Sequence, residues 1–456
     1  MLYMTFHLPE YIQLRDYQKK AIRNWRQNKG TGLLEMATGT GKTITALALA
    51  SDLFQDMKRL NIIIVTPFTQ LSSQWMDECR NFGLKPIKGY QASKLWQAQL
   101  DDAIRAYKKG YTDLVVTVTT NATFSMPSFQ EKLNKMDENT LLIVDEAHYF
   151  GANKLNRSLP QHVKYRLALT ATPTRWRDIE GTDNLLSYFG NEVVFSFSLK
   201  EAIEMGFLTK YYYYPRLVHL NDRETEEYVE LTKKIKKLYF RSKEDSSAKE
   251  SMEKLSLRRA RIIQSAENKL YELIRLLKET GVNSHSLFYC GDGEFEGERQ
   301  VDVVVKILRE HFELKASRFT SRETNLERDD LLSNFEAGST QALVAIKCLD
   351  EGIDVPATKY AYLIASSGNP KEFVQRRGRV LRKHSGKKAA TIYDFIVVPP
   401  DLAEISDASD DYHNMVRSQL KKEFLRFKEF SSLAINGPEA EDVIWELKKE
   451  FNLMDI

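Results

Sequence analysis

The sequence predicts an α/β protein with two tandem domains, each built on a parallel sheet, with a helical segment between them and a helical tail. Three observations support this fold class. Short aliphatic runs alternate with amphipathic stretches over residues 1–210, and the same alternation returns over residues 281–400. Between the two blocks, residues 221–280 are dense in Glu, Lys, Arg and Leu and contain neither glycine nor proline, which is typical of helices.

The first block contains short runs of aliphatic and β-branched residues, as buried parallel strands do. The stretch after the first run, Lys42–Met57, is rich in Ala and Leu and predicts a helix. Strands that alternate with helices favour a parallel sheet with helices on both faces. The expected strands are Gly32–Met36, Asn61–Val65, Leu114–Val118, Leu141–Asp145 and Arg166–Leu169.

The second block repeats this pattern, with Gln300–His311 as one of its expected helices, and the chain after Pro399 is mostly helical and charged. We expect the two α/β domains to span residues 1–210 and 281–400. A mostly helical linker is expected over 211–280 and a helical extension over 401–456. The expected strands of the second domain are Ser286–Tyr289, Ser317–Phe319, Ala342–Ile346, Tyr360–Ile364 and Ala390–Phe395.

Two features of the linker have competing interpretations. Its charges fit a solvated helical hairpin, which we favour, or a contact with nucleic acid. The run Tyr211–Tyr214 before Pro215 fits base stacking, or an interdomain strand whose alternate rings pack on opposite faces, which we favour.

The composition is that of an ordinary globular protein. Charged residues make up 28% of the 456 residues and the formal net charge is +3, which permits a nucleic-acid partner without indicating one. Cys79, Cys290 and Cys348 are too far apart for a zinc site or a disulfide framework, so we expect a reducing, cytoplasmic location. The chain has neither a signal-peptide start nor an apolar run of about 18 residues, so no membrane partner is expected.

Residues 36–43 read Met-Ala-Thr-Gly-Thr-Gly-Lys-Thr, between a predicted strand and a predicted helix. Glycines let backbone N–H groups turn toward a phosphate, and the helix N-terminus adds positive potential. The lysine can bond the β- and γ-phosphates, and the last hydroxyl can bind Mg²⁺. Met36 replaces the first glycine of the strict pattern, so a glycine-rich turn that merely opens a helix is the alternative. The expected nucleotide-binding residues are Thr38, Gly39, Thr40, Gly41, Lys42 and Thr43, of which Thr43 also binds the metal.

A second chemical motif follows the apolar run Leu141–Val144, which leads directly into Asp145, Glu146 and, two residues later, His148. Carboxylates at the carboxyl end of a buried strand lie where α/β sheets bind ligands. Asp145 is expected to hold Mg²⁺, and Glu146 to orient and deprotonate the attacking water. His148 is expected to sense the nucleotide state through a hydrogen bond. A solvated loop is the usual alternative for an isolated Asp-Glu pair.

These two motifs resemble motifs I and II of superfamily 2 helicases, and further matches follow in the family's order over residues 14–382. Residues 14–18, Leu-Arg-Asp-Tyr-Gln, resemble the upstream motif in which the glutamine, here Gln18, reads the adenine. Residues 169–173, Leu-Thr-Ala-Thr-Pro, resemble motif III, which implies that Thr170 and Thr172 act with His148 in coupling hydrolysis to domain movement. Thr66, Pro67 and Gln70 resemble motif Ia, and Thr119 and Thr120 resemble motif Ib. The resemblance implies that these residues contact nucleic-acid phosphates through hydroxyls and backbone N–H groups.

The second block carries the remaining resemblances. Residues 287–290 resemble motif IV. Residues 347–356 resemble motif V, which implies a nucleic-acid contact at Lys347 and nucleotide contacts at Gly352 and Asp354.

Residues 375–382, Gln-Arg-Arg-Gly-Arg-Val-Leu-Arg, resemble motif VI. Guanidinium groups can neutralise the charge that develops on the γ-phosphoryl oxygens. By family position, Arg379 and Arg382 are the arginine fingers, and Gln375 is the sensor of the γ-phosphate. An Arg-rich face that is solvated or binds phosphate is the alternative.

The resemblance as a whole implies two RecA-like domains that bind ATP and Mg²⁺ between them and move along nucleic acid, with double-stranded DNA as the expected partner. The catalytic residues it implies are Lys42, Asp145, Glu146, Gln375, Arg379 and Arg382.

A narrower resemblance is to the motor subunits of type III-like restriction systems, and within them to the helicase proteins of DNA phosphorothioation restriction. The stretches Lys210–Pro215, Tyr289–Gly293 and Asn369–Arg382 carry it. It implies a bacterial defence role. Since no nuclease motif follows residue 382, restriction of DNA would need a nuclease or another restriction subunit in trans, or the motor action of this chain would have to suffice. The alternatives are an ATP-gated clamp that senses DNA and recruits a nuclease, a helicase of DNA repair or recombination, an RNA helicase, and a nuclease in its own right.

Overall fold

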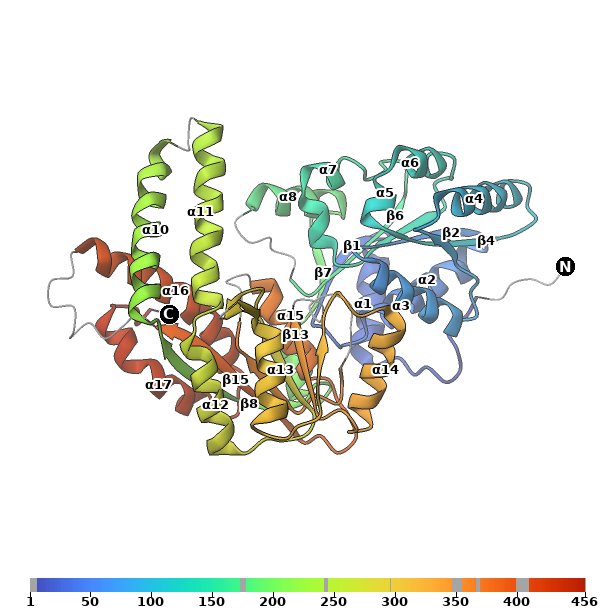
Figure 1. Cartoon of the computed structure of the whole chain (residues 1–456). Helices are drawn as coiled ribbons and strands as arrows, with labels where there is room; N and C mark the ends of the chain where they lie inside the picture. Colours follow the sequence, from blue (N-terminus) through green and yellow to red (C-terminus); the bar gives the residue numbers. More distant parts are fainter. Residues whose placement is uncertain are drawn as a thin grey trace. The chain divides into compact units, whose positions relative to one another are not determined.

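The structure is a computed structural model that describes residues 6–172, 178–241, 245–295, 297–346, 355–365, 370–398 and 410–455. It divides into two compact units, the first ending at Leu208 and the second beginning at Thr209. Each unit is built on its own parallel sheet, which confirms the predicted fold class. Figure 1 labels the elements along the chain.

Within the described residues, the first unit holds a seven-stranded sheet in the order β3-β4-β2-β5-β6-β1-β7, in which every neighbouring pair is parallel. The sequence predicts five of these strands but neither of the two edge strands. One edge strand has only three residues, and the other alternates between exposed and buried positions. The strands are β1 Thr31–Met36, β2 Leu60–Thr66, β3 Ile87–Gly89, β4 Leu114–Thr120, β5 Thr140–Val144, β6 Tyr165–Thr170 and β7 Val193–Phe197.

Helices cover both faces of this sheet. All side chains of β2 and β5 are buried, and alternate side chains of a strand point to opposite faces. On one face the core includes Trp96, Phe129 and Leu185 from three different helices. The helices are α1 Asp16–Gln27, α2 Lys42–Met57 (the predicted bounds), α3 Thr69–Asn81, α4 Ser93–Lys108, α5 Asn121–Phe124, α6 Pro127–Leu133, the 3₁₀ helix η1 Ala147–Gly151, α7 Asn153–Asn156, α8 Ile179–Tyr188 and α9 Leu199–Glu204.

In the described part of the second unit, a six-stranded parallel sheet has the order β12-β13-β9-β14-β15-β8, and β10 and β11 form a small antiparallel hairpin. The five predicted strands correspond to β9, β12, β13, β14 and β15. The strands are β8 Lys210–His219, β9 Ser286–Cys290, β10 Glu294–Phe295, β11 Glu298–Arg299, β12 Ala316–Phe319, β13 Ala342–Ile346, β14 Tyr360–Leu363 and β15 Ala389–Val398.

Two helices of the second unit form a long hairpin that stands out from its sheet (Figure 1). At its base, Leu220, Tyr228, Ile262 and Val397 form a small core. The helices are α10 Asp222–Arg241 and α11 Ser246–Gln264, which make the hairpin, then α12 Asn268–Thr280, α13 Gln300–Glu310, α14 Asn325–Glu336, α15 Pro370–Val380, α16 Asp410–Ser431 and α17 Gly437–Glu450.

The segment 211–280, expected to be a mostly helical linker, begins with a strand. β8 pairs with β15 along its whole length and is an edge strand of the second sheet. The tyrosines form a strand because they alternate between the two faces of the sheet. Tyr211 and Tyr213 are fully buried, whereas Tyr212 and Tyr214 are 37% and 41% exposed. The expected strand with alternate rings on opposite faces is therefore confirmed, but it is an edge strand of the second sheet and not a strand between domains.

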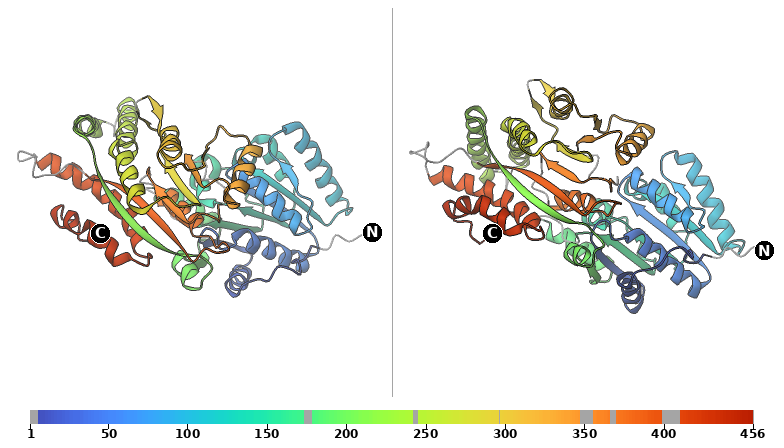
Figure 2. Two further views of the ribbon diagram at one scale, coloured as in Figure 1. Left: turned by 60° about the horizontal axis from the view of Figure 1, so that its bottom comes forward. Right: turned by 90° about the horizontal axis from the view of Figure 1, so that it is seen from below.

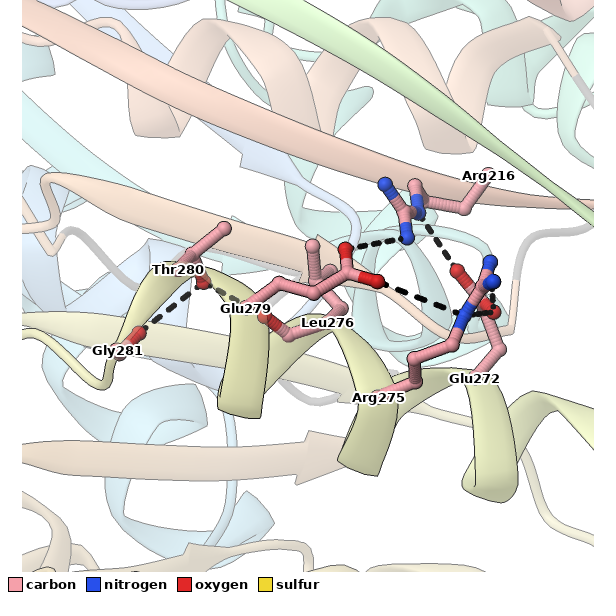
Figure 3. Close-up of polar contacts among 7 residues, drawn as sticks. All are labelled: Arg216, Glu272, Arg275, Leu276, Glu279, Thr280 and Gly281. Carbon is pink, nitrogen blue, oxygen red and sulfur yellow. Dashed lines mark hydrogen bonds and ion pairs between the residues drawn. The ribbon is translucent and has the colours of Figure 1, made fainter.

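An ion network ties α12 to β8 (Figure 3). Arg216 on β8 donates to Glu272 at 2.6 Å and to Glu279 at 3.0 Å. Glu272 also accepts from Arg275 at 2.8 Å. These contacts fix the helix that directly follows the α10–α11 hairpin onto the sheet.

The helices α16 and α17 lie against β8 and β15 (Figure 2). Asp394 on β15 accepts two hydrogen bonds of 3.0 Å from Arg426 on α16, and one of 2.9 Å from the Tyr213 hydroxyl. Both charged groups are almost fully buried, and their pairing offsets the cost of removing them from water. Within the ranges that the structure describes, no helix has the length and apolar character needed to cross a membrane.

Candidate nucleotide-binding site

The phosphate loop joins the end of β1 to the start of α2. Gly39 and Gly41 both have a φ of +85°, in the left-handed region that suits glycine. Lys42 and Thr43 occupy the first two positions of α2, where backbone N–H groups have no partner within the helix. The Lys42 ammonium donates to the carbonyl of Met36 at 3.2 Å.

The two threonines of the loop have different surroundings. The Thr40 hydroxyl donates to the Ala37 carbonyl at 2.7 Å, and the Thr40 carbonyl accepts from the Tyr17 hydroxyl at 2.6 Å. The Tyr17 ring stacks on Phe197 with ring centres 4.1 Å apart. Thr40 therefore stabilises the conformation of the loop through hydrogen bonds within the protein. The Thr38 hydroxyl oxygen is buried and meets no hydrogen-bond partner among the described residues, so a phosphate oxygen would satisfy it.

Gln18, expected to read adenine, lies against the same loop. Its amide nitrogen donates to the Thr45 hydroxyl at 3.1 Å and to the Gly41 carbonyl at 3.4 Å. Its amide oxygen accepts from the backbone N–H of Arg15 at 3.0 Å. Gln18 therefore braces the start of α2, with one lone pair of the amide oxygen left for another donor. Adenine recognition by Gln18 stays a prediction.

Asp145 follows β5 and is only 4% exposed. The indole N–H of Trp75, on α3, donates to one carboxylate oxygen at 2.8 Å, and the backbone N–H of Glu146 donates to the other at 2.9 Å. Burial raises the pKa of Asp145, while the positive charge of Lys42 and these two hydrogen bonds oppose the rise. Because Lys42 and Asp145 interact electrostatically, the two predicted chemical motifs meet at one edge of the first sheet.

The residues expected to couple hydrolysis to movement also lie together. Glu146 has φ 46° and ψ 49°, a left-handed conformation that is rare outside glycine and that clusters at functional sites. The buried ring of His148 places Nδ1 3.5 Å from a Glu146 carboxylate oxygen and 3.3 Å from the Thr170 hydroxyl. The Thr170 hydroxyl also donates to the Thr172 carbonyl and accepts from its N–H, both at 3.1 Å. The expected general base and the three expected coupling residues therefore form one cluster.

The residues of this edge fit a magnesium–nucleotide complex. The Thr43 hydroxyl and the Asp145 carboxylate are the hard oxygen ligands that Mg²⁺ prefers. The loop N–H groups, the Thr38 hydroxyl and Lys42 suit phosphate oxygens. Over the described ranges there is no cluster of three or more His, Cys, Asp or Glu side chains that could hold a metal ion.

Three further predicted catalytic residues lie on α15 or directly after it. Gln375 is half-buried on the helix, Arg379 is 8% exposed, and Arg382 follows the end of the helix. Burial lowers the pKa of Arg382 to about 10. The guanidinium is therefore still charged at neutral pH but poorly hydrated, which favours binding to an anion. Contact of these groups with phosphates held by the first unit stays a prediction.

The other two arginines of this motif hold the second unit together. Arg376 donates to the Ala365 carbonyl at 2.9 Å and lies over the ring of Tyr289. Arg377, 1% exposed, donates to both the carbonyl and the carboxylate of Glu429 on α16. For this pair, the alternative of a solvated Arg-rich face is wrong, because both side chains are buried.

The backbone of Arg382 is fixed from two sides. The Lys387 ammonium donates to the Arg382 carbonyl at 3.0 Å and to the carbonyls of Val380 and Pro356. The hydroxyl of Thr209 donates to the same Arg382 carbonyl at 3.3 Å. Sequence reasoning missed Lys387, Trp75 and Tyr17, since their partners are far along the chain or are main-chain atoms.

The residues expected to grip nucleic acid are less accessible than the resemblance implies. The Thr66 hydroxyl pairs with that of Ser72 at 2.6 Å, and the Thr119 hydroxyl donates to the Gly89 carbonyl at 2.6 Å. The Thr120 hydroxyl caps α5. The hydroxyls at these three positions are therefore already bonded within the protein. Of the other residues predicted to contact nucleic acid or nucleotide, Pro67 and Gln70 are half-buried. Lys347, Gly352 and Asp354 lie outside the described residues.

Two family models match the chain. The model of the type III restriction enzyme res subunit matches residues 11–175, which include the phosphate loop and the Asp145 cluster. The model of the helicase conserved C-terminal domain matches residues 268–384, which include α15 and Arg382.

The chain is also similar to DNA translocases and restriction enzymes. It is 25% identical over 398 residues to the DNA 3'-5' translocase XPB2 of Sulfurisphaera tokodaii, covering 82% of this chain and 80% of that protein. It is 29% identical over 212 residues to the type I restriction enzyme EcoAI endonuclease subunit of Escherichia coli, covering 44% of this chain and 23% of that subunit. The solved structure of the ATP-dependent Type ISP restriction-modification enzyme LlaBIII bound to DNA has a TM-score of 0.62 at 18% identity, over 91% of this chain and 30% of that one. The chain spans about half to two thirds of the length of several other curated relatives.

Proposed function

From the premise that the chain contains both domains of a superfamily 2 helicase and has homologues in that superfamily, we propose that it is an ATP-driven translocase on double-stranded DNA. The families it matches are ATP-hydrolysing helicases and translocases. The observation that carries the proposal is the cluster in which His148 links Glu146 to Thr170. It joins the expected hydrolytic base to the expected coupling motif.

Each residue of the site has a part in the proposed reaction. When bound, ATP and Mg²⁺ supply the phosphoryl group and the counter-charge that hydrolysis needs. Lys42 binds the β- and γ-phosphates, while Thr43 and Asp145 hold the metal. Glu146 orients the attacking water and accepts its proton. Arg379 and Arg382 neutralise the charge that develops on the γ-phosphoryl oxygens, and Gln375 senses that group.

His148 supplies the coupling step. In the tautomer with its proton on Nδ1, His148 can donate from that nitrogen to only one acceptor at a time. Both Glu146 and Thr170 lie within about 3.5 Å of Nδ1. A change in the position or charge of Glu146 during hydrolysis therefore changes the bond to Thr170, and Thr172 follows through its two bonds to the Thr170 hydroxyl.

Replacing Lys42 tests the ATPase, and a displacement assay tests translocation. Lys42→Ala is expected to abolish DNA-stimulated hydrolysis with the fold retained, and full stimulated activity in that variant would refute the role. ATPase stimulation by duplex DNA, single-stranded DNA and RNA would then be compared, because an RNA helicase responds best to RNA. Displacement of a third strand from triplex DNA separates a translocase from an ATP-gated clamp, which hydrolyses ATP without displacement.

The proposed setting is bacterial restriction or phage defence, with cleavage supplied by a partner nuclease or restriction subunit. The type III restriction family model and the type I restriction relative support it, whereas the XPB2 relative favours the alternative of DNA repair or recombination. The resemblance to phosphorothioation-dependent restriction stays a prediction. Phage plating on bacteria that express the chain in its native gene neighbourhood tests the setting. Plaque numbers are expected to rise when Lys42 is replaced by Ala, and equal plating contradicts the defence role.

A further inference from the structure

We infer that the outer face of the second half of α10 binds the phosphate backbone of double-stranded DNA. The inference rests on the proposed function, since it assigns a contact surface to that substrate. It concerns the helical hairpin, whose charges the sequence alone leaves open between solvation and nucleic-acid contact.

The helical period separates an inner and an outer face of α10. Leu231 is buried and Ile235 and Leu238 are half-buried, whereas Lys233 and Lys237 are exposed. At 100° per residue, the two lysines lie on the side opposite to those apolar residues. The inner face packs along α11 (Figure 1), so the outer face is directed to solvent.

The outer face changes sign midway along the helix. Apart from Arg223, the exposed charged side chains of its first half are acidic: Asp222, Glu226 and Glu230. The charged side chains of its second half are all basic and all exposed: Lys233, Lys234, Lys236, Lys237 and Arg241.

The acidic and basic halves also differ in how they are paired. Glu227 forms an ion pair of 2.6 Å with Arg258 of α11, and Glu230 pairs with Lys234 at 2.5 Å. By contrast, the side chains of Lys233 and Lys237 make no ion pair or hydrogen bond with any of the described residues. The first half of α11 also carries carboxylates, of which Glu250 pairs with Lys254 at 2.7 Å. Lys233 and Lys237 therefore keep positive charge that no described carboxylate pairs with.

Stabilisation of the helix does not account for this charge. Cations interact favourably with the C-terminal end of a helix, but the effect falls off within the last turn. Lys233 lies more than two turns before Arg241, the last residue of α10. Lys233 and Lys237 are one turn apart, about 6 Å, and their long side chains can reach neighbouring phosphates without reading the base sequence.

Charge reversal at these two lysines tests the inference. The variant Lys233→Glu/Lys237→Glu is compared with Lys278→Glu/Lys306→Glu, which makes the same change of charge at exposed lysines of α12 and α13 in the same unit. The affinity for a fluorescein-labelled DNA duplex of arbitrary sequence is measured by anisotropy over a range of salt concentrations. Because the four positions are exposed, both variants are expected to keep the parent's circular dichroism and its ATPase rate without DNA.

The hairpin variant is expected to bind the duplex at least about tenfold more weakly at low salt. The slope of log affinity against log salt should fall by about 2, since each lost phosphate contact removes about 0.9. The α12–α13 variant is expected to keep the parent's slope. Equal slopes and affinities for the two variants would overturn the inference while leaving the proposed function intact. If the parent chain itself is neither bound nor stimulated by duplex DNA, the proposed function fails first.

Discussion

The ammonium group of Lys387 donates a hydrogen bond to the main-chain oxygen of Arg382, over 3.0 Å. Burial lowers the pKa of Lys387 to about 7, and the positive charge of Lys359 adds to the effect. A titratable group therefore holds the turn that carries one of the two expected arginine fingers.

This pKa predicts that the contribution of Lys387 to stability grows with pH. The ordinary value for lysine is 10.5, against about 7 here, so between these values the unfolded state binds more protons and stability rises with pH. Wild type should therefore gain stability relative to Lys387→Met between about pH 7 and pH 10. Unfolding by urea at both pH values measures it. A difference between the two proteins that does not change with pH contradicts the prediction.

The hydrogen bond from Trp75 to Asp145 predicts a weaker metal site in Trp75→Phe. The substitution keeps an aromatic ring but removes a donor to a buried carboxylate, a bond worth about 1.5–3 kcal/mol. The Mg²⁺ concentration for half-maximal ATPase should rise about tenfold or more. Trp96→Phe is the matched control, because Trp96 is equally buried in the same unit but packs on Phe129. An unchanged Mg²⁺ dependence in Trp75→Phe would show that the bond does not support the site.

The His148–Thr170 contact predicts uncoupling of hydrolysis from movement. In His148→Ala, DNA-stimulated hydrolysis should persist, while triplex displacement per ATP falls about tenfold, within the usual range of coupling energies. Thr170→Val should have a similar effect, and the double variant should be no worse than either single one. Strictly additive losses in this cycle would mean that the two residues act independently.

The buried pairing of Arg377 with Glu429 predicts a structural role. Arg377→Met should destabilise the second unit by about 2–4 kcal/mol, because the carbonyl and carboxylate of Glu429 lose a charged donor. The exposed Arg261, on α11, is the control, and Arg261→Met should change stability by less than about 0.5 kcal/mol. Urea unfolding followed by circular dichroism gives both values. A loss of ATPase in Arg377→Met without a loss of stability would assign the residue to catalysis instead.

Local patterns predicted the strands that lie inside each sheet, because parallel strands buried on both faces are continuous apolar runs. The rule found β12 at one edge of the second sheet but not the edge strands β3 and β7 of the first, since β3 has three residues and β7 is partly solvated. The edge strand β8 is not a continuous apolar run, and its start was expected only from the alternation of its tyrosines.

The site was predictable where its chemistry is local in sequence. The loop from Thr38 to Thr43 and the pair Asp145–Glu146 are contiguous motifs. Trp75, which orients Asp145, lies 70 residues away along the chain and could be found only from the fold. Sequence also could not show that Arg377 is a buried anchor, since its burial depends on the packing of α16.

The central claim, that residues of both units act on one nucleotide, is tested most directly by ATP hydrolysis and ATP binding in Arg382→Ala. Hydrolysis stimulated by duplex DNA is expected to fall about 10³-fold. Binding of a fluorescent ATP analogue should change little, because the phosphate loop of the first unit is intact. A stimulated rate equal to that of the parent would contradict the claim.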